Sequence, residues 1–205
     1  GIAGCTALMT AGFGIKNSIE SLIHNQYGEL IHYDSVATFT DGVTQEDVDT
    51  LEGDLSADGH IDDFLLNCGY SDDVKSSEDT ETAEYVIVDD KNAFKDYVTL
   101  RTRRKHNDVV LGDSGVVITE KLSKDLGVKK GDKITVTSSA GKHAEAVVSG
   151  ITEMYVNHYV YISTEYYNEL FGNIPEHNRV LIKISGDVSE TESYMGDEYL
   201  SRDYI

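Results

Sequence analysis

The sequence predicts an α+β fold in which a mixed sheet with helices is interrupted along the chain by an inserted β-rich module. Three observations lead to this prediction. Patterns typical of strands and helices follow one another as strand, helix, two or three strands, module, strand and helix. The module itself consists of short apolar strands separated by glycine-containing turns. An uncharged apolar opening precedes all of this, which is typical of the end of a membrane helix.

The opening segment, Gly1–Ile15, carries no charge, and the first charged residue is Lys16. Glycine and alanine recur in this segment as they do on the packing faces of membrane helices. It is shorter than the roughly 20 residues that span a bilayer, and neither an initiator Met nor a basic region precedes it. We therefore expect a fragment of a longer protein, in which one helix leaves the membrane and continues as a stalk to about Tyr27.

Three other interpretations of the opening remain open. The run from Ile2 to Cys5 resembles a lipoprotein lipobox, although a polar tether normally follows a lipidated Cys and here ten apolar or small residues follow it. The length also suits the apolar region of a signal peptide, but no clear cleavage site follows. A buried helix of a soluble domain fits the same pattern of residues.

Composition limits the classes of function. The 205 residues allow one large domain or two small ones, and a hydrophobic content of 40% supports a real core. The formal net charge of −20 argues against a nucleic-acid partner, because phosphates would be repelled. The two cysteines, Cys5 and Cys68, form no disulfide framework, which is compatible with the cytosol and equally with the outer surface of bacteria that use few disulfides.

The negative charge is concentrated in one part of the chain. Between Asp41 and Asp90 there are 17 Asp and Glu residues and a single Lys, a local net charge of −16. A solvated acidic face explains this composition, and so do divalent-cation binding and long-range attraction of a cationic peptide. The peptide hypothesis singles out four carboxylates, namely Asp72, Asp73, Glu78 and Asp79.

The first elements after the stalk are a strand and a helix. Residues 29–40 are rich in β-formers. Thr44 then has the position of a helix N-cap, and Asp47 completes a short variant of the capping box. A helix of roughly 45–55 with one apolar face follows, and Gly59 ends it.

Strand patterns dominate the next part of the chain. Strands are expected at 61–76 and 83–89, followed by a helical turn near 92–94 and another strand at 97–102. A charged loop at 101–106 contains the only basic cluster, for which lipid head groups, an intramolecular acidic face and plain solvation are the alternatives. The cluster consists of Arg101, Arg103, Arg104 and Lys105.

The inserted module is expected to contain four strands and two short helices. Its strands are predicted at 115–119, 133–138, 143–151 and 156–163. Thr119 and Thr164 have the positions of helix N-caps, and a glycine ends each helix. These glycines are Gly127 and Gly172. After the module, 179–184 has the pattern of a core strand, and 190–200 that of a weakly helical acidic tail.

One segment has part of the pattern of a calcium-binding loop. Oxygen-bearing residues occupy loop positions 1, 3, 5 and 9, and Gly59 stands at position 6. They are Asp54, Ser56, Asp58 and Asp62. Position 12, which should be a bidentate Glu, is Leu65, and the residues around it favour a strand over a helix. A helix-terminating acidic turn is the alternative interpretation.

No catalytic or cofactor-binding signature is present. The seven histidines are scattered without the spacing of a zinc motif, and His158 is interpreted as a structural residue. The sequence lacks a nucleophile elbow, a Walker A loop and a dinucleotide-binding glycine motif. We therefore expect neither an enzyme nor a bound cofactor.

Several stretches together resemble a known family. The opening GIAGCTALMTAGFGIKNSIESLIHNQYGELIHYD resembles the end of the first membrane helix of FtsX-like ABC transporter permeases, where it enters their extracytoplasmic domain. The later stretches GVVITEKLSKDLGVKKGDKITV and MYVNHYVYISTEYYNELFG are similar to the β module inserted in that domain. The resemblance covers nearly the whole chain, and it rests on hydrophobic and turn patterns.

The resemblance implies a domain organisation. In this family, which includes MacB-like exporters, the large domain between the first two membrane helices has a porter-like α+β part and an inserted β-rich subdomain. Residues 1–28 would be the end of the transmembrane and stalk helix. Residues 29–107 and 179–205 would form the porter-like part, and 108–178 the inserted subdomain.

The resemblance also implies a function. ATP-driven movement of membrane helices would reach this domain on the extracytoplasmic side of the cell membrane and drive export of a substrate or control an extracellular partner. The expected partners are a cytoplasmic ABC ATPase subunit, a second permease chain in a dimer, and a peptide, lipid or cell-wall component outside. The alternative is a surface binding module with a membrane or lipid anchor, with or without calcium, and with no ATPase partner.

Overall fold

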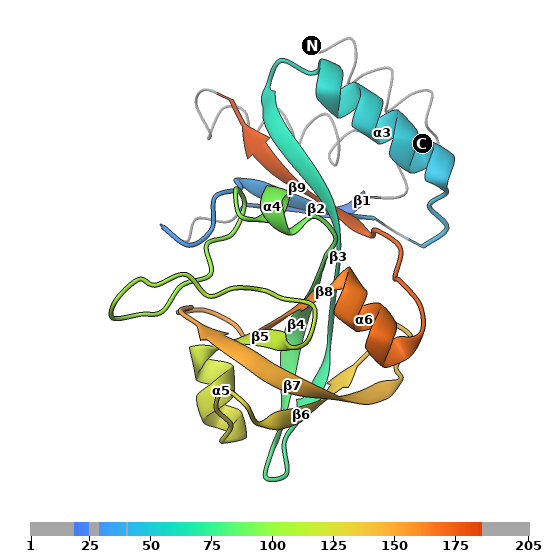
Figure 1. Ribbon diagram of the computed structural model, residues 1–205. Coiled ribbons are helices and arrows are strands. Elements are labelled where there is room, and N and C mark those ends of the chain that lie inside the picture. Colours follow the sequence, from blue (N-terminus) through green and yellow to red (C-terminus); the bar gives the residue numbers. More distant parts are fainter. Residues whose placement is uncertain (1–18, 25–28, 40, 186–205) are drawn as a thin grey trace. The chain divides into compact units, whose positions relative to one another are not determined.

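The computed structural model describes residues 19–24, 29–39 and 41–185, which form two compact units (Figure 1). Unit 1 comprises the described residues up to Leu66 and those from Asn178 onward. Unit 2 comprises Asn67–His177. Each unit has its own cluster of buried apolar side chains. The α+β class predicted from the sequence is confirmed, since strands and helices share both cores.

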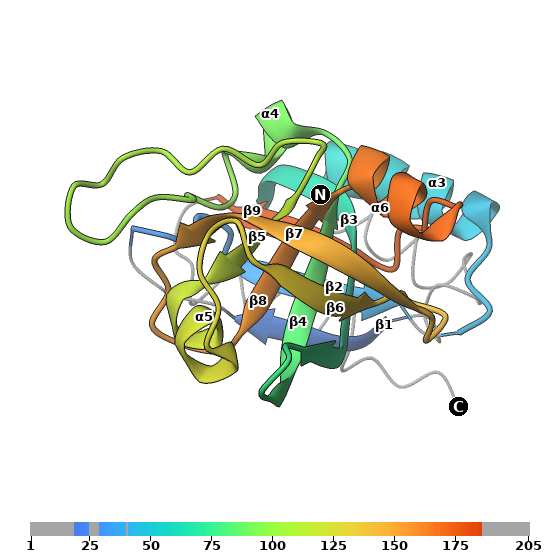
Figure 2. The same ribbon diagram turned by 60° about the horizontal axis from the view of Figure 1, so that its bottom comes forward.

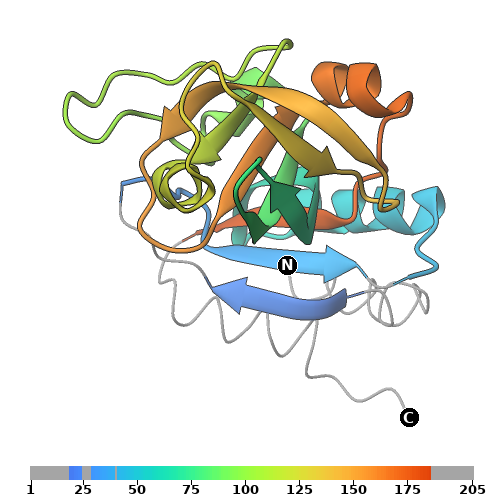
Figure 3. The ribbon, with the colours of Figure 1, turned by 90° about the horizontal axis from the view of Figure 1, so that it is seen from below.

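Unit 1 is built on strands from widely separated parts of the sequence. They are β1 (Ile19–His24), β2 (Ser35–Phe39), β9 (Arg179–Ile184) and the first part of β3 (Ile61–Lys75). The order across the sheet is β1-β2-β9-β3, and β2 pairs antiparallel with both of its neighbours (Figure 3). The strand predicted at 179–184 is therefore confirmed.

Helix α3 (Gln45–Ala57) supplies the helical side of the unit 1 core. The predicted capping box is confirmed, because Asp47 N donates to Thr44 Oγ1 at 3.2 Å and Thr44 N donates to Asp47 Oδ2 at 3.0 Å. Three buried residues spaced at intervals of three and four positions face strands β2 and β9. They are Val48, Leu51 and Leu55, which cluster with Ala37, Val180 and Ile182.

The predicted stalk helix is wrong at Ile19–His24, where the structure has strand β1. A recurrence of apolar residues over so short a run does not separate helix from strand, and pairing with β2 decides in favour of the strand. The rest of the predicted membrane and stalk segment lies outside the described residues, as does the predicted acidic tail at 190–200. Among the described residues, no helix is long and apolar enough to cross a membrane.

Unit 2 is a closed barrel of six strands (Figure 2). The strands are β3, β4 (Thr80–Val88), β8 (Tyr159–Ser163), β5 (Val116–Thr119), β7 (His143–Thr152) and β6 (Lys133–Thr137), in this order around the barrel. The last strand returns to the first, where Lys75 pairs with Thr135. The pairs β4–β8 and β5–β7 are parallel and the others antiparallel. The single pair of Lys75 and Thr135 joins the two outer strands of the ladder and closes it.

Residues 67–107 and the predicted insert belong to one compact unit, because unit 2 begins at Asn67. The physical reason is strand pairing, because β4 lies between β3 and β8 and pairs with both. The segment before the predicted insert therefore belongs to the same unit as the insert. The division into a porter-like part at 29–107 and 179–205 and an insert at 108–178 stays a prediction.

A buried tyrosine, Tyr85, forms hydrogen bonds to two strands inside the barrel. Tyr85 is 0% exposed, and its ring stacks on Tyr70 with the centroids 4.9 Å apart. Its hydroxyl donates to Asp73 O at 2.6 Å and accepts from Thr137 N at 3.0 Å. Burial raises the pKa of Tyr85 to about 12. One side chain thus bonds the backbones of β3 and β6, the two strands that close the barrel.

Helices α4 (Lys91–Phe94), α5 (Glu120–Leu126) and α6 (Thr164–Phe171) complete unit 2. The N-cap position predicted for Thr119 is confirmed, and the one predicted for Thr164 is wrong. Thr119 precedes α5 without a side-chain cap bond, because its Oγ1 accepts from Tyr159 N instead. The N-cap of α6 is Ser163, whose Oγ accepts from Tyr166 N, and Thr164 is the first helical residue. The predicted glycine ends are confirmed, since Gly127 and Gly172 have φ of 67° and 77°.

The strand predicted at 97–102 is wrong. Residues 95–97 form a turn, and the segment contains only single-residue β-bridges, at Val98 and at Arg101, the latter to Asp108. Tyr97 and Val98 are buried, so the apolar pattern was real, but it reflects packing rather than strand pairing. Strand β8 likewise begins at Tyr159 and not at 156.

Candidate functional site

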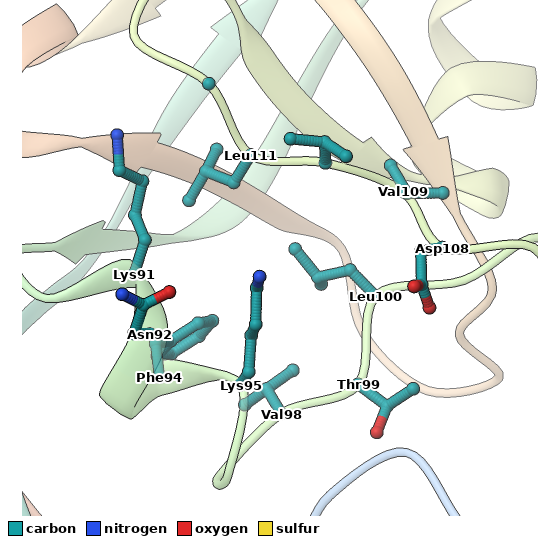
Figure 4. Close-up of a pocket in the computed structure, with 12 residues that line it drawn as sticks. Lys91, Asn92, Phe94, Lys95, Val98, Thr99, Leu100, Asp108, Val109 and Leu111 are labelled. Atoms are coloured by element: carbon teal, nitrogen blue, oxygen red, sulfur yellow. The ribbon is translucent and has the colours of Figure 1, made fainter.

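A cavity in unit 2 lies between α4 and the loop that follows it. Its volume is about 490 Å³. Residues from two facing segments line it, 91–100 on one side and 108–112 on the other (Figure 4). A cavity of this size falls within the range that holds small ligands.

The lining combines apolar walls with cationic side chains. Phe94 and Val98 are 4% and 5% exposed, and Leu100, Val109 and Leu111 complete the apolar part. Lys91 and Lys95 come from α4 and the turn after it, and Lys95 extends toward the facing segment (Figure 4). Lys91 forms an ion pair with Asp113, and the Asp108 carboxylate also lines the cavity. Apolar walls beside charges of both signs suit a ligand that has an apolar body and a polar group.

A buried ion pair holds the loop beside the cavity. Arg101 Nε donates to Glu153 Oε2 at 2.8 Å, and the Glu153 side chain is 2% exposed. The backbones join as well, since Glu153 N donates to Arg101 O at 2.8 Å and Arg101 N donates to Thr152 Oγ1 at 2.9 Å. The Tyr155 hydroxyl also donates a hydrogen bond to Glu153. This bond is the main cause of a lowered pKa of Glu153, and the hydrogen bond from Arg101 is the second cause.

A second arginine ties the same loop to α5. Arg103 makes a two-pronged contact to Glu120, with Nε and Nη2 at 3.0 and 2.9 Å from its oxygens. The guanidinium also lies over the Tyr155 ring, 4.8 Å from its centroid. Of the alternatives for the basic cluster, the intramolecular acidic contact is therefore confirmed for Arg101 and Arg103. Arg104 and Lys105 are exposed.

Sequence reasoning missed both carboxylate partners of this loop. Glu120 and Glu153 are 17 and 52 positions from their arginines, and neither lies in a recognisable motif. The basic cluster itself was the only signal, because a dense group of arginines on an acidic chain indicates internal partners.

The residues of the predicted calcium loop belong to separate elements. Asp54 and Ser56 lie within α3, where Ser56 Oγ donates to Glu52 O, and Asp62 lies in β3. Asp58 is the helix C-cap and its Oδ1 accepts from His60 N at 2.9 Å. Partial burial raises the pKa of Asp54. Within the described residues, these four do not form a cluster that an ion can share.

The acidic segment is divided between the two units. Nine of its carboxylates, from Asp41 to Asp63, belong to unit 1, and the other eight, from Asp72 to Asp90, belong to unit 2. The four carboxylates of the peptide hypothesis lie in or beside the β3–β4 hairpin, and three of them are exposed. The sequence run is therefore not one continuous structural element.

Comparison with known proteins identifies the family. The model of the MacB-like periplasmic core domain matches residues 1–193. The extracellular domain of the noncanonical ABC-type transporter YknZ from Gram-positive bacteria is 14% identical, with a TM-score of 0.47, over 78% of this chain and 81% of that one. The periplasmic region of MacB from Actinobacillus actinomycetemcomitans is 13% identical, with a TM-score of 0.44, over 93% and 86%. No curated protein matches significantly.

The assignment rests on the family match, which spans both units and all of the described residues. Members of this family are generally non-catalytic and lie on the extracytoplasmic side of the membrane. The cavity and its arginine-held loop are thus features of a domain outside the membrane. The chain belongs to the MacB-like periplasmic core domain family and is an extracytoplasmic domain of a MacB/FtsX-like ABC transporter permease.

Proposed function

We propose that this domain couples ATP-driven movement of membrane helices to an event outside the membrane. In this proposal a separate cytoplasmic ATPase hydrolyses ATP, and the permease acts as a dimer. The supporting observation is that β1 and β9, which lie near opposite ends of the chain, both pair with β2. Movements that arrive from either flank therefore reach the same sheet.

The pairing supplies a physical route for such movement. Backbone hydrogen bonds join β1 to β2 through pairs such as Ile23 with Val36, and β2 to β9 through pairs such as Ala37 with Val180. Sheet bonds act together, so a displacement of one outer strand moves the whole layer. Asp34 adds a side-chain link, because its Oδ2 accepts from Ile184 N at 2.7 Å.

Unit 2 is proposed to carry the contact with the outside substrate or partner. In the terms of the family, unit 1 would be the porter-like part and unit 2 the inserted subdomain. The cavity beside α4 favours a ligand with an apolar body and a polar group, which describes some peptides, lipids and cell-wall components alike. Its loop is fixed by the Arg101–Glu153 pair, so the cavity is formed before a ligand arrives.

The coupling is tested in the full-length permease with its ATPase by inserting a short flexible Gly/Ser linker directly after Ser185. We expect ATP hydrolysis and assembly to persist and transport to fall, because slack between β9 and the following segment absorbs the movement. The matched control carries the same linker at Gly141, in the exposed β6–β7 turn, and should transport normally.

Two outcomes contradict the proposal. Unchanged transport with the linker after Ser185 would show that β9 does not carry the movement. Failure of any ATPase to copurify with the full-length protein would favour the anchored binding module without an ATPase partner.

A further inference from the structure

Three side chains from separate elements of unit 2 converge on one point. Glu81 lies in β4, Asp125 in the last turn of α5, and His158 directly before β8. His158 Nε2 is 3.1 Å from Asp125 Oδ2 and 3.8 Å from Glu81 Oε2. One ligand atom from each residue lies within 4.8 Å of the other two, and this is the one such group of His, Cys, Asp and Glu among the described residues.

The backbone holds these three residues in place without a ligand. Glu84 N donates to His158 O at 2.8 Å, and the next residue, Tyr159, donates its N–H to Thr119 Oγ1 at 3.1 Å. The last turn of α5 is fixed as well, because Ser76 Oγ donates to Leu126 O at 2.7 Å. The positions are therefore set by the barrel and not by the contacts within the group.

Charge distinguishes this group from an ordinary ion pair. Two carboxylates face a single imidazole, so with a neutral imidazole the three groups carry a net charge of −2. A proton on His158 removes only half of that charge, whereas a divalent cation cancels it.

We propose that Glu81, Asp125 and His158 form a binding site for a zinc-like divalent transition-metal ion. Imidazole and carboxylate together suit zinc, whereas calcium and magnesium take oxygen ligands. Ligand atoms that share one zinc ion lie about 3.3 Å apart, and the 3.1 Å separation is already close to this value. Rotation of the Glu81 side chain brings in the third ligand.

The site is open to solvent on its carboxylate side. The side chains of Glu81 and Asp125 are each 34% exposed, whereas that of His158 is 13% exposed. An ion can therefore enter past the carboxylates and keep a water in the fourth position. Bound metal would join β4, α5 and the start of β8, and so stabilise unit 2 by binding only its folded form.

The test is titration of the 205-residue chain with ZnCl₂ by calorimetry, together with Co²⁺ absorption as a spectroscopic readout. We expect one ion per chain, a higher unfolding temperature with zinc, and the visible bands of low-coordinate Co²⁺. His158→Gln and Asp125→Asn should each weaken zinc binding by about 100-fold or more, which is at least the loss seen when groups supporting a ligand are removed.

The matched control is His177→Gln. His177 pairs with Asp89 and, among the described residues, does not belong to a group of three ligand residues, so it is a partly exposed histidine beside one carboxylate. Binding that survives His158→Gln and Asp125→Asn, or that His177→Gln removes equally, would overturn the proposal and indicate adventitious binding to surface histidines. Circular dichroism of each variant separates loss of the site from loss of the fold, and Asp125→Asn, on an exposed carboxylate, provides the test if His158→Gln fails to fold.

Discussion

Unit 1 and unit 2 are assembled in opposite ways. Unit 1 brings together segments that lie far apart in the sequence, and its Asp34–Ile184 contact joins residues 150 positions apart. Unit 2 is one continuous segment, Asn67–His177, that closes on itself at Lys75 and Thr135. The sheet of unit 1 therefore depends on strands from distant parts of the sequence, whereas the barrel of unit 2 is formed within one segment.

The two units also differ in their balance of acidic and basic residues. The described residues of unit 1 from Glu29 onward contain eleven acidic residues and two basic ones, and unit 2 contains nineteen and thirteen. Unit 2 therefore pairs carboxylates internally, as Arg101 with Glu153 and Arg103 with Glu120. The described residues of unit 1 from Glu29 onward have nine more acidic than basic side chains, an excess that attracts positively charged partners.

The largest expected effect is on the barrel. Tyr85→Ala should lower the free energy of unfolding of unit 2 by about 3–5 kcal/mol, because it removes a fully buried ring and two backbone hydrogen bonds. Calorimetry should show the transition of unit 2 shifted to lower temperature and that of unit 1 unchanged. If both transitions move together, the two units are not independent in stability.

A second core substitution, Leu55→Ala, should destabilise unit 1 in place of unit 2. Leu55 is 1% exposed in the core between α3 and the sheet, so Leu55→Ala should cost about 2–5 kcal/mol of the stability of unit 1. In the Leu55→Ala variant, zinc should still raise the unfolding temperature of unit 2, and Tyr85→Ala should still destabilise unit 2 by the same amount. Hydrogen exchange of β5 amides, which report on the barrel, provides the check, and faster exchange there would contradict independence.

A smaller effect concerns the charge pairing of unit 2. Glu153→Gln should lower the free energy of unfolding of unit 2 by about 1–3 kcal/mol at neutral pH, since it loses a charge-assisted bond. The folded pKa of Glu153 lies below its ordinary 4.5, so its contribution is present above that pH and is lost as pH falls through the lower folded value. Acid titration of stability should therefore be flatter in the variant, and parallel curves would refute this assignment.

The smallest effect is at the start of α3. Thr44→Ala removes one half of the capping box and should cost about 1 kcal/mol of the stability of unit 1. Thr50→Ala, an exposed position within the same helix, is the control and should change little. Urea unfolding of the two variants measures the difference, and equal midpoints would mean that the cap contributes nothing to folding.

Much of the secondary structure was predictable because local patterns determine it. The capping box of Thr44 and Asp47, the glycine ends at Gly127 and Gly172, and the strand at 179–184 depend on residues only a few positions apart. The failures share one cause. Residues 19–24 and 97–102 have apolar patterns that fit more than one element, and the presence or absence of a neighbouring strand decided between them.

The sequence alone determined the α+β class, the caps and turns of individual elements, and the concentration of acidic residues, because these follow from neighbours along the chain. Only the tertiary structure decided that 67–107 belongs to unit 2, that Arg101 meets Glu153, and that Glu81, Asp125 and His158 converge. These features join positions that are tens of residues apart. Strand pairing and packing, which no local pattern encodes, bring such positions together.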